Sequence, residues 1–143
     1  MNIKNEKRKI KEIDGKAYIF DIIRKKYIYL TPEEIVRQNF LDYLISEKKY
    51  SKNLIKLESQ IKYNTLEKRS DILVYDISGQ PFLLVECKAD SVAINQKTIE
   101  QASRYNLQMK APYLCVTNGL KTFCFEVNFE KNTFVQLSNI PDF

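Results

Sequence analysis

Three side chains near the middle of the chain, Asp71, Glu86 and Lys88, combine two carboxylates with an ammonium group. The acids border the apolar runs 72–75 and 82–85, where a charge is unfavourable unless something compensates it. A divalent cation is the simplest compensator, because Mg²⁺ prefers carboxylate oxygens. Such an ion can activate water and stabilise charge on a phosphate, and a nearby lysine can orient or deprotonate the attacking water. The three residues therefore predict metal-dependent hydrolysis of a phosphodiester bond.

A β-hairpin is the element that must bring these side chains together. Residues 69–76 and 82–88 are rich in β-branched and aromatic residues, as strands are, and the segment 78–81 between them has the composition of a turn. Folding the second strand back on the first places Asp71, near the start of the hairpin, beside Glu86 and Lys88 at its end.

Glu86 and Lys88 lie two residues apart, so we expect both side chains on one face of the strand. Cys87 then points the other way, into the core, and its backbone carbonyl is a candidate further metal ligand. The alternative is a purely structural ion pair between Glu86 and Lys88, which the sequence leaves open.

The amino-acid composition excludes several classes of active site. The 143 residues predict a single domain, 1–143, and contain no histidine and only three glycines. Histidine-dependent hydrolases and zinc proteases are excluded, and there is no Gly-rich phosphate loop for ATP. The three cysteines show no metal-ligand spacing and resemble small buried hydrophobes, typical of a reducing compartment. With no signal peptide and no apolar run of membrane-spanning length, we expect a cytoplasmic protein without membrane contact.

The positive charge is concentrated in the first half of the chain. Residues 1–70 contain 17 Lys and Arg against 10 Asp and Glu, whereas residues 71–143 contain 6 against 8. Residues 1–12 are a candidate mobile basic tail. A polyanion such as nucleic acid fits this distribution, and so does a solubilising lysine-rich surface.

The remaining pattern predicts an α/β (α+β) fold, with a mixed central sheet flanked by helices and an N-terminal β-hairpin. The order is β-β-α-β-β-β-α-β-β, with one more edge strand. Besides the central hairpin, the predicted strands are 17–23, 27–30, 54–63, 113–117, 122–128 and 133–137, and the predicted helices are 31–47 and 98–110.

The first helix has a clear start. Thr31 is the expected N-cap, Pro32 suits the first helical position, and Glu34 is placed to complete a capping box. Glu33 is then the acid expected on the core-facing side, with Arg37 one turn later on the same face as a candidate partner or phosphate contact. Glu33 could equally stabilise the helix dipole from its first turn, and the choice between Glu33 and Glu34 stays open.

Five segments in this order carry a resemblance to a known family. They are 31–38, 68–71, 85–88, Gln101-x-x-x-Tyr105 and 117–119. Together they resemble the N-terminal nuclease domain of type I restriction enzyme R subunits, in the RecB-like Gln-x-x-x-Tyr branch of the PD-(D/E)xK nuclease superfamily. The similarity extends from residue 31 to about residue 126. Ser70 replaces the Pro of the superfamily's name, and the helicase-like motor of R subunits has no counterpart in the sequence.

The resemblance implies a restriction-endonuclease-like core and assigns roles to residues. Asp71 and Glu86 match the metal-binding acids, and Lys88 matches the catalytic lysine. The other residues that it brings into the site are Glu33 and Gln101 for catalysis and Arg37, Arg69 and Tyr105 for contacts with nucleic acid. Arg69 could also be an ordinary surface charge.

The expected function is therefore Mg²⁺-dependent endonuclease activity on DNA by a stand-alone domain, with Mn²⁺ able to substitute for Mg²⁺. The alternative is a module that retains the fold and binds nucleic acid or a partner without cutting. A homodimer and a separate motor or specificity subunit are both compatible with the resemblance, whereas ATP is not expected to bind. Four aromatic residues, Tyr18, Phe20, Tyr27 and Tyr29, could stack on bases, although packing on a strand face is the commoner reason for such residues.

Overall fold

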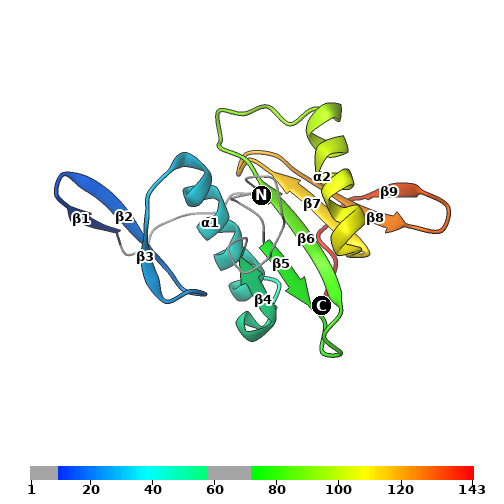
Figure 1. Ribbon diagram of the computed structural model, residues 1–143, viewed down its shortest axis with the longest axis horizontal. Coiled ribbons are helices and arrows are strands. Elements are labelled where there is room, and N and C mark those ends of the chain that lie inside the picture. The colour runs from blue at the N-terminus through cyan, green and yellow to red at the C-terminus, as the bar shows by residue number, and fades with distance from the viewer. Residues whose placement is uncertain (1–9, 58–71) are drawn as a thin grey trace.

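The structure is a computed structural model that describes residues 10–57 and 72–143. In chain order, its elements are β1 (Ile10–Ile13), β2 (Lys16–Asp21), β3 (Lys26–Tyr29), α1 (Pro32–Ser46), the short 3-10 helix η1 (Lys52–Leu54), β4 (Ile55–Leu57), β5 (Ile72–Tyr75), β6 (Pro81–Cys87), α2 (Gln96–Met109), β7 (Tyr113–Thr117), β8 (Thr122–Asn128) and β9 (Thr133–Leu137) (Figure 1).

The main sheet has the strand order β4-β5-β6-β7-β8-β9. Its strands run antiparallel to their neighbours except for β6 and β7, which are parallel and are joined through α2. A parallel pair needs such a crossover connection, because a tight turn cannot return the chain to the same end of the sheet. The mixed central sheet with flanking helices confirms the predicted fold class.

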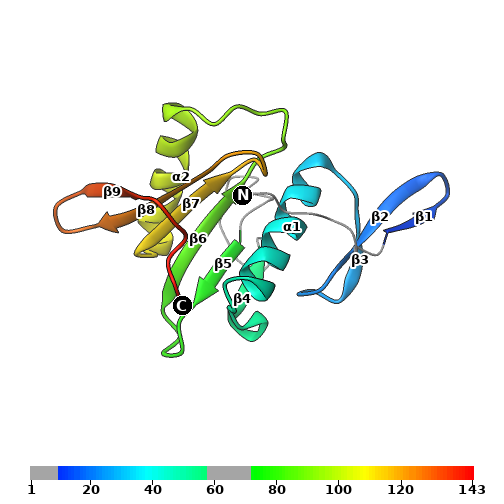
Figure 2. The ribbon, with the colours of Figure 1, turned by 180° about the vertical axis from the view of Figure 1, so that it is seen from behind.

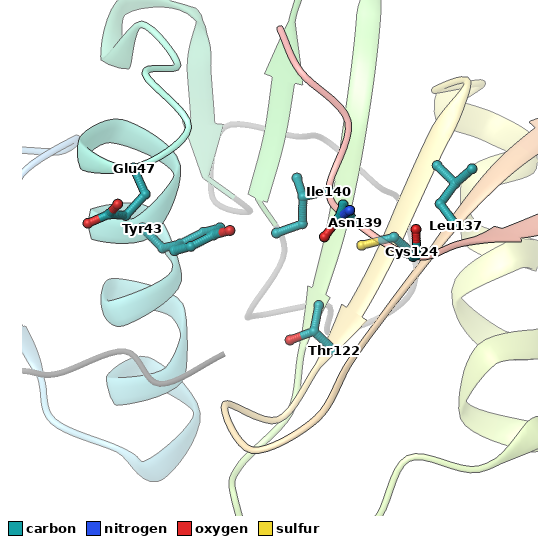
Figure 3. Close-up of a pocket in the computed structure, with 8 residues that line it drawn as sticks. Tyr43, Glu47, Thr122, Cys124, Leu137, Asn139 and Ile140 are labelled. Atoms are coloured by element: carbon teal, nitrogen blue, oxygen red, sulfur yellow. The ribbon is translucent and has the colours of Figure 1, made fainter.

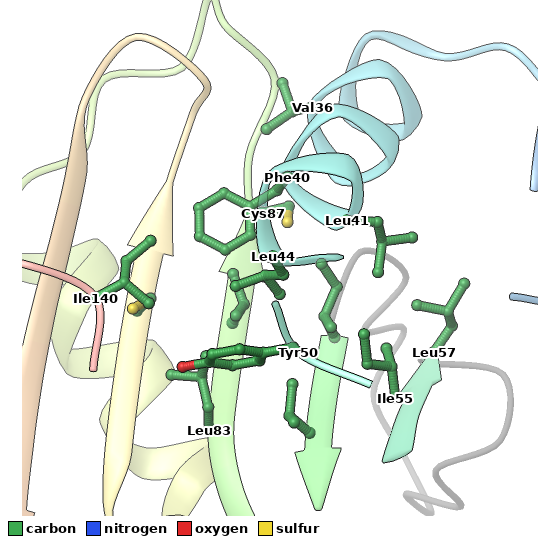
Figure 4. Close-up of a cluster of buried hydrophobic side chains, with 14 of the residues drawn as sticks. Val36, Phe40, Leu41, Leu44, Tyr50, Ile55, Leu57, Leu83, Cys87 and Ile140 are labelled. Atoms are coloured by element: carbon green, nitrogen blue, oxygen red, sulfur yellow. The ribbon is translucent and has the colours of Figure 1, made fainter. Parts of the chain in front are cut away.

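The two helices cover opposite faces of this sheet. In β6, Leu83, Val85 and Cys87 are buried in the core cluster that includes Phe40 of α1 (Figure 4). Their neighbour Leu84 is instead buried with Ala102 and Tyr105 of α2. Side chains alternate between faces along a strand, so α1 covers the face of β6 that carries Leu83, Val85 and Cys87, and α2 covers the face that carries Leu84.

A second sheet, ordered β1-β2-β3, lies on the other side of α1 from the main sheet (Figures 1 and 2). It replaces the expected N-terminal hairpin with three antiparallel strands. The added strand, β1, includes residues 10–12, which were expected to belong to the basic tail, and residues 1–9 lie outside the described residues. β1 joins β2 through Asp14 and Gly15, both with positive φ (52° and 78°), as a tight hairpin turn requires.

Most predicted element boundaries agree with the structure. The predicted bounds of β7, β8 and β9 are confirmed without change. The second helix begins earlier than predicted, at Gln96, because Asn95 and Thr98 form a reciprocal capping box. Of the predicted strand 54–63, Leu54 belongs to η1, β4 covers Ile55–Leu57, and residues 58–63 lie outside the described residues. No helix in the described ranges is long and apolar enough to cross a membrane.

The β5–β6 turn is held by one aspartate. An Oδ of Asp76 accepts hydrogen bonds from the Ser78 hydroxyl (2.6 Å), the Ser78 N–H (2.9 Å) and the Gln80 N–H (3.0 Å). The hydrogen bond from the Ser78 hydroxyl, followed by the one from the Gln80 N–H, lowers the pKa of Asp76 below its usual value of 3.8. The turn therefore favours the ionised form of this carboxyl.

An Asp76→Asn variant is expected to show at which pH the charge of Asp76 stabilises the fold. The stabilisation from a carboxyl with a lowered pKa is complete above its unfolded-state value of 3.8 and is lost as the pH falls through the lower folded-state value. The wild type should therefore melt at a higher temperature than Asp76→Asn at neutral pH, and this advantage should shrink below pH 3.8. Thermal melts across the acid range measure the difference, and a gap that stays constant with pH would contradict this assignment.

Candidate active site

Glu86 and Lys88 lie at the carboxyl end of β6, next to β7. Glu86 pairs in register with Val116 of β7, and Lys88, the first residue after the strand, donates its backbone N–H to the Thr117 carbonyl at 2.8 Å. The Lys88 Nζ lies 3.3 Å from Oε1 of Glu86. Both side chains therefore lie on one side of the strand, as their spacing predicts, and they form a direct ion pair.

The two charges differ in their access to solvent. Glu86 is only 3% exposed, whereas the Lys88 side chain keeps 27% of its surface exposed. Glu86 follows Leu84 on the α2 face of the sheet and pairs with the buried Val116. A carboxylate in such apolar surroundings requires compensation, and the Lys88 ammonium supplies part of it. The pair thus joins a buried negative charge to a cation that solvent can reach.

Cys87 points to the opposite face, as predicted. Its side chain is fully buried in the α1-side cluster with Val85 and Phe40. The thiol therefore has a packing role, and the role of its backbone carbonyl as a metal ligand stays a prediction.

The second predicted acid, Asp71, lies outside the described residues, as does Arg69. The β5–β6 register pairs Ile72 with Val85. In the sequence, Asp71 is one peptide bond from Ile72, and Glu86 is one peptide bond from Val85. The predicted convergence of the two acids rests on this register.

The described residues supply one ligand of the predicted metal site. Glu86 provides a buried carboxylate, a ligand type that Mg²⁺ prefers. Among residues 10–57 and 72–143, no three Asp, Glu or Cys side chains gather closely enough to hold a metal by themselves. A metal centre at Glu86 would therefore need a ligand from outside these ranges, and Asp71 stays the predicted one.

The helix acid that faces inward is Glu34, so the expectation that Glu33 faces the core was wrong, whereas its catalytic role stays a prediction. Glu33 is exposed, whereas Glu34 is only 6% exposed. The Thr31 hydroxyl caps the helix by accepting the Glu34 N–H at 3.0 Å, as predicted. The Glu34 carboxylate, however, accepts hydrogen bonds from the Arg37 guanidinium and from Gln38, whose Nε2 donates to Oε2 at 3.0 Å.

Arg37 is buried and is the partner of a helix acid, Glu34, while its contact with nucleic acid stays a prediction. Only 2% of its surface is exposed, and its guanidinium binds both oxygens of Glu34. A second arginine, Arg24, approaches Glu34 at 3.7 Å and contacts the fully buried Asp21 at 2.6 Å. These four residues, named here the buried charge cluster, tie the β2–β3 turn to the first turns of α1.

The two residues of the Gln-x-x-x-Tyr motif differ in their exposure to solvent. Gln101 is exposed on α2, while Tyr105 is 5% exposed and packs with Leu84 and Leu114. The Tyr105 ring is therefore part of the core, and its contact with nucleic acid stays a prediction. Gln101 is accessible, and its catalytic role stays a prediction.

The segment 117–119 positions the chain around Lys88, a role that sequence reasoning missed. The Asn118 Nδ2 donates to the Val92 carbonyl at 2.9 Å, which ties down the loop that follows Lys88. The Asn118 Oδ1 accepts the N–H groups of Leu120 and Lys121. Gly119 has a φ of 86°, and a Cβ there would lie 3.4 Å from a Val36 methyl. The motif therefore joins the end of β6 to α1.

A cavity of about 460 Å³ lies elsewhere, between α1, β8 and the chain after β9 (Figure 3). Its lining includes Tyr43 and Glu47 of α1, Thr122 and Cys124 of β8, and Ile140. Cys124 and Ile140 belong to the core cluster on the α1 face, whereas Glu86 lies on the α2 face. The cavity is therefore separate from the Glu86–Lys88 pair.

Comparison with known proteins identifies the family. A family model described as "Type I restriction enzyme R protein N terminus (HSDR_N)" matches residues 32–141. No curated protein matches the chain. The matched range runs from the first turn of α1 to the segment after β9 and includes the Glu86–Lys88 pair. The chain belongs to the type I restriction enzyme R protein N-terminus family.

Proposed function

We propose that the protein hydrolyses DNA phosphodiester bonds in a Mg²⁺-dependent reaction, with Asp71, Glu86 and Lys88 as its catalytic residues. The observation that carries this proposal is the buried Glu86 carboxylate with the Lys88 ammonium 3.3 Å away. Family membership supports a nuclease-type domain. The proposal adds the metal, the residues and the stand-alone activity.

Within this proposal, each residue has a distinct task. Asp71 and Glu86 would hold Mg²⁺, which when bound supplies Lewis-acid activation of water and of the phosphate. Lys88 lies beside Glu86 with part of its side chain in solvent, so its ammonium can reach a phosphate or the attacking water from outside. Ala102 and Tyr105 of α2 pack with Leu84 on the same face of β6, and Glu86, two residues further along the strand, is buried.

Cleavage of supercoiled plasmid tests the proposal. The wild type is expected to nick or linearise plasmid with Mg²⁺ or Mn²⁺, and EDTA should abolish cleavage because the two carboxylates then hold no cation. An Asp71→Asn variant should lose cleavage as well. Asp90→Asn is the matched control, since Asp90 is an exposed acid close to Lys88 in the chain. Wild-type protein that leaves every DNA form intact, or an Asp71→Asn variant as active as Asp90→Asn, would falsify the assignment.

One observation favours the second candidate, a module that binds without cutting. Lys88 contacts Glu86 directly at 3.3 Å, a geometry that also suits a structural ion pair. Such a module would bind DNA with an affinity that depends on salt but not on Mg²⁺ or on a Lys88→Ala substitution. Binding titrations with and without Mg²⁺ separate the two functions.

A further inference from the structure

The small sheet β1-β2-β3 presents one face rich in aromatic side chains. Tyr18 and Phe20 of β2 pair in register with Tyr29 and Tyr27 of β3. We call these four rings the aromatic face. Tyr27 and Tyr29 are 37% and 52% exposed, and the other two rings are half-buried. Among the described residues, neither buried core cluster includes any of the four.

The opposite face of the same sheet is the one that is buried. Ile19 and Asp21 of β2 are fully buried, and Asp21 joins the buried charge cluster through Arg24. Side chains alternate along a strand, so the aromatic face points away from the side that α1 occupies. Figure 1 shows this sheet at one end of the molecule, far from β7 to β9. The four rings therefore lie on an outer surface.

The rings are held in fixed pairs. Tyr18 and Tyr29 meet edge to face with centroids 5.7 Å apart, and Phe20 and Tyr27 do so at 5.3 Å. Edge-to-face pairing leaves part of each ring's π-surface uncovered by its partner. Neighbouring same-face residues on one strand are about 7 Å apart. The result is a row of aromatic surfaces fixed in place before any ligand arrives.

Lysines accompany these rings. Lys11 of β1 lies opposite Tyr18 in register, and its Nζ sits 5.4 Å from the centre of the Tyr27 ring. Lys16 begins β2 on the same face, and both lysines are exposed. Of the strand residues that the structure describes on this face, none is acidic. The surface therefore combines aromatic rings with positive charge alone.

We propose that the aromatic face of the β1-β2-β3 sheet binds single-stranded DNA, with bases stacked on Tyr27 and Tyr29 and phosphates near Lys11 and Lys16. Bases in a single strand expose their π-surfaces and stack on aromatic side chains without regard to sequence, while a basic surface attracts the backbone. In a duplex the base faces are stacked on one another and cannot reach the rings. The choice of DNA as the polyanion rests on the proposed function, whereas the stacking itself does not.

Fluorescence anisotropy with a labelled 20-nucleotide thymidine oligomer, with EDTA present, tests this proposal. Tyr29→Ala is expected to weaken binding by roughly 5- to 100-fold, the loss of one stacked base. Tyr29→Phe should bind like the wild type, because the ring is retained. Phe134→Ala is the matched control, since Phe134 is 44% exposed on β9 and pairs edge to face with Phe125 at 5.2 Å. It should bind the oligomer like the wild type, and circular dichroism should show all variants folded.

Further measurements, with other nucleic acids and by tyrosine fluorescence, identify the ligand. A duplex of the same length should bind Tyr29→Ala and the wild type equally, because it offers no free base faces. Quenching of intrinsic tyrosine emission by the oligomer should report stacking directly, since the chain contains no tryptophan. The proposal fails if Tyr29→Ala and Tyr27→Ala bind the oligomer as tightly as Phe134→Ala, which is also the result if a protein occupies this face. Tighter binding of a uridine RNA oligomer would overturn the choice of DNA. Because EDTA prevents cleavage, a failed nuclease assay does not affect these outcomes.

Discussion

A Lys88→Met variant is expected to cleave plasmid about 10²- to 10³-fold more slowly than the wild type, the usual effect of removing one charge-stabilising or proton-transfer group. Lys88 Nζ is 3.3 Å from Glu86 Oε1 and part of the side chain reaches solvent. Its removal therefore deletes the cation next to the buried acid. Single-turnover plasmid cleavage measures the loss, since it isolates the chemical step from product release.

Two other lysine variants sharpen this result. Lys97→Met is the matched control, because Lys97 is an exposed lysine on α2 and its loss changes the net charge equally. Lys88→Arg keeps a positive charge beside Glu86, so it should retain more activity than Lys88→Met if charge is the main contribution. Equal cleavage rates for Lys88→Met and Lys97→Met would remove Lys88 from the reaction.

Removing Arg37 is expected to destabilise the fold by about 3–5 kcal/mol, the range for breaking a buried ion pair from one side. Arg37→Met leaves Glu34 buried, with Arg24 at 3.7 Å as a more distant cation and one amide hydrogen bond from Gln38. The free energy of unfolding, from urea titration followed by circular dichroism, measures this effect.

The control for this prediction is Arg104→Met, because Arg104 is exposed on α2 and its loss should change the stability by less than about 0.5 kcal/mol. The double variant Glu34→Gln/Arg37→Met should be more stable than the sum of the single losses implies, since no unpaired buried charge remains. A single-variant loss as small as that of Arg104→Met would show that the buried charge cluster does not hold α1 to the small sheet.

The positions of the strands around the site could be predicted because local signals and burial agree there. β7 and β8 are apolar runs separated by the Asn118-Gly119 turn, and both match their predicted bounds. Glu86 and Lys88 share one side of the chain for the same local reason, their spacing of two. Cys87 and its core contacts follow from the same alternation.

The helix acid could not be predicted because α1 packs on two sides. Counting back from Val36 and Phe40 places Glu33 over the main sheet. Glu34, however, lies in line with Gln38 and Leu41, which are also fully buried. The sequence of α1 shows one apolar stripe. It cannot show that a second sheet covers the polar stripe next to it. Glu34 and Gln38, the polar residues of that second stripe, are buried, and their side chains are joined by an ion pair with Arg37 and by hydrogen bonds.

β1 was missed for a different reason. All four of its residues are exposed, and the pattern Ile-Lys-Glu-Ile does not alternate cleanly between apolar and polar. The available signal was Asp14-Gly15, a dipeptide typical of a two-residue hairpin turn, which lies directly before the predicted strand at residue 17. The burial of Tyr105 could not be predicted, because its spacing from Gln101 says only that they share a helix side, not how deep that side lies.

The parallel pairing of β6 with β7 also governs the order in which the molecule can assemble. The two strands are separated in the chain by the loop after Lys88 and the whole of α2. Closing so long a loop costs conformational entropy before any contact compensates for it, which slows folding. The Lys88 N–H meets the Thr117 carbonyl only once that closure is complete. During refolding we therefore expect the antiparallel hairpins to form early and the end of β6 that carries the catalytic candidates to take its final shape late.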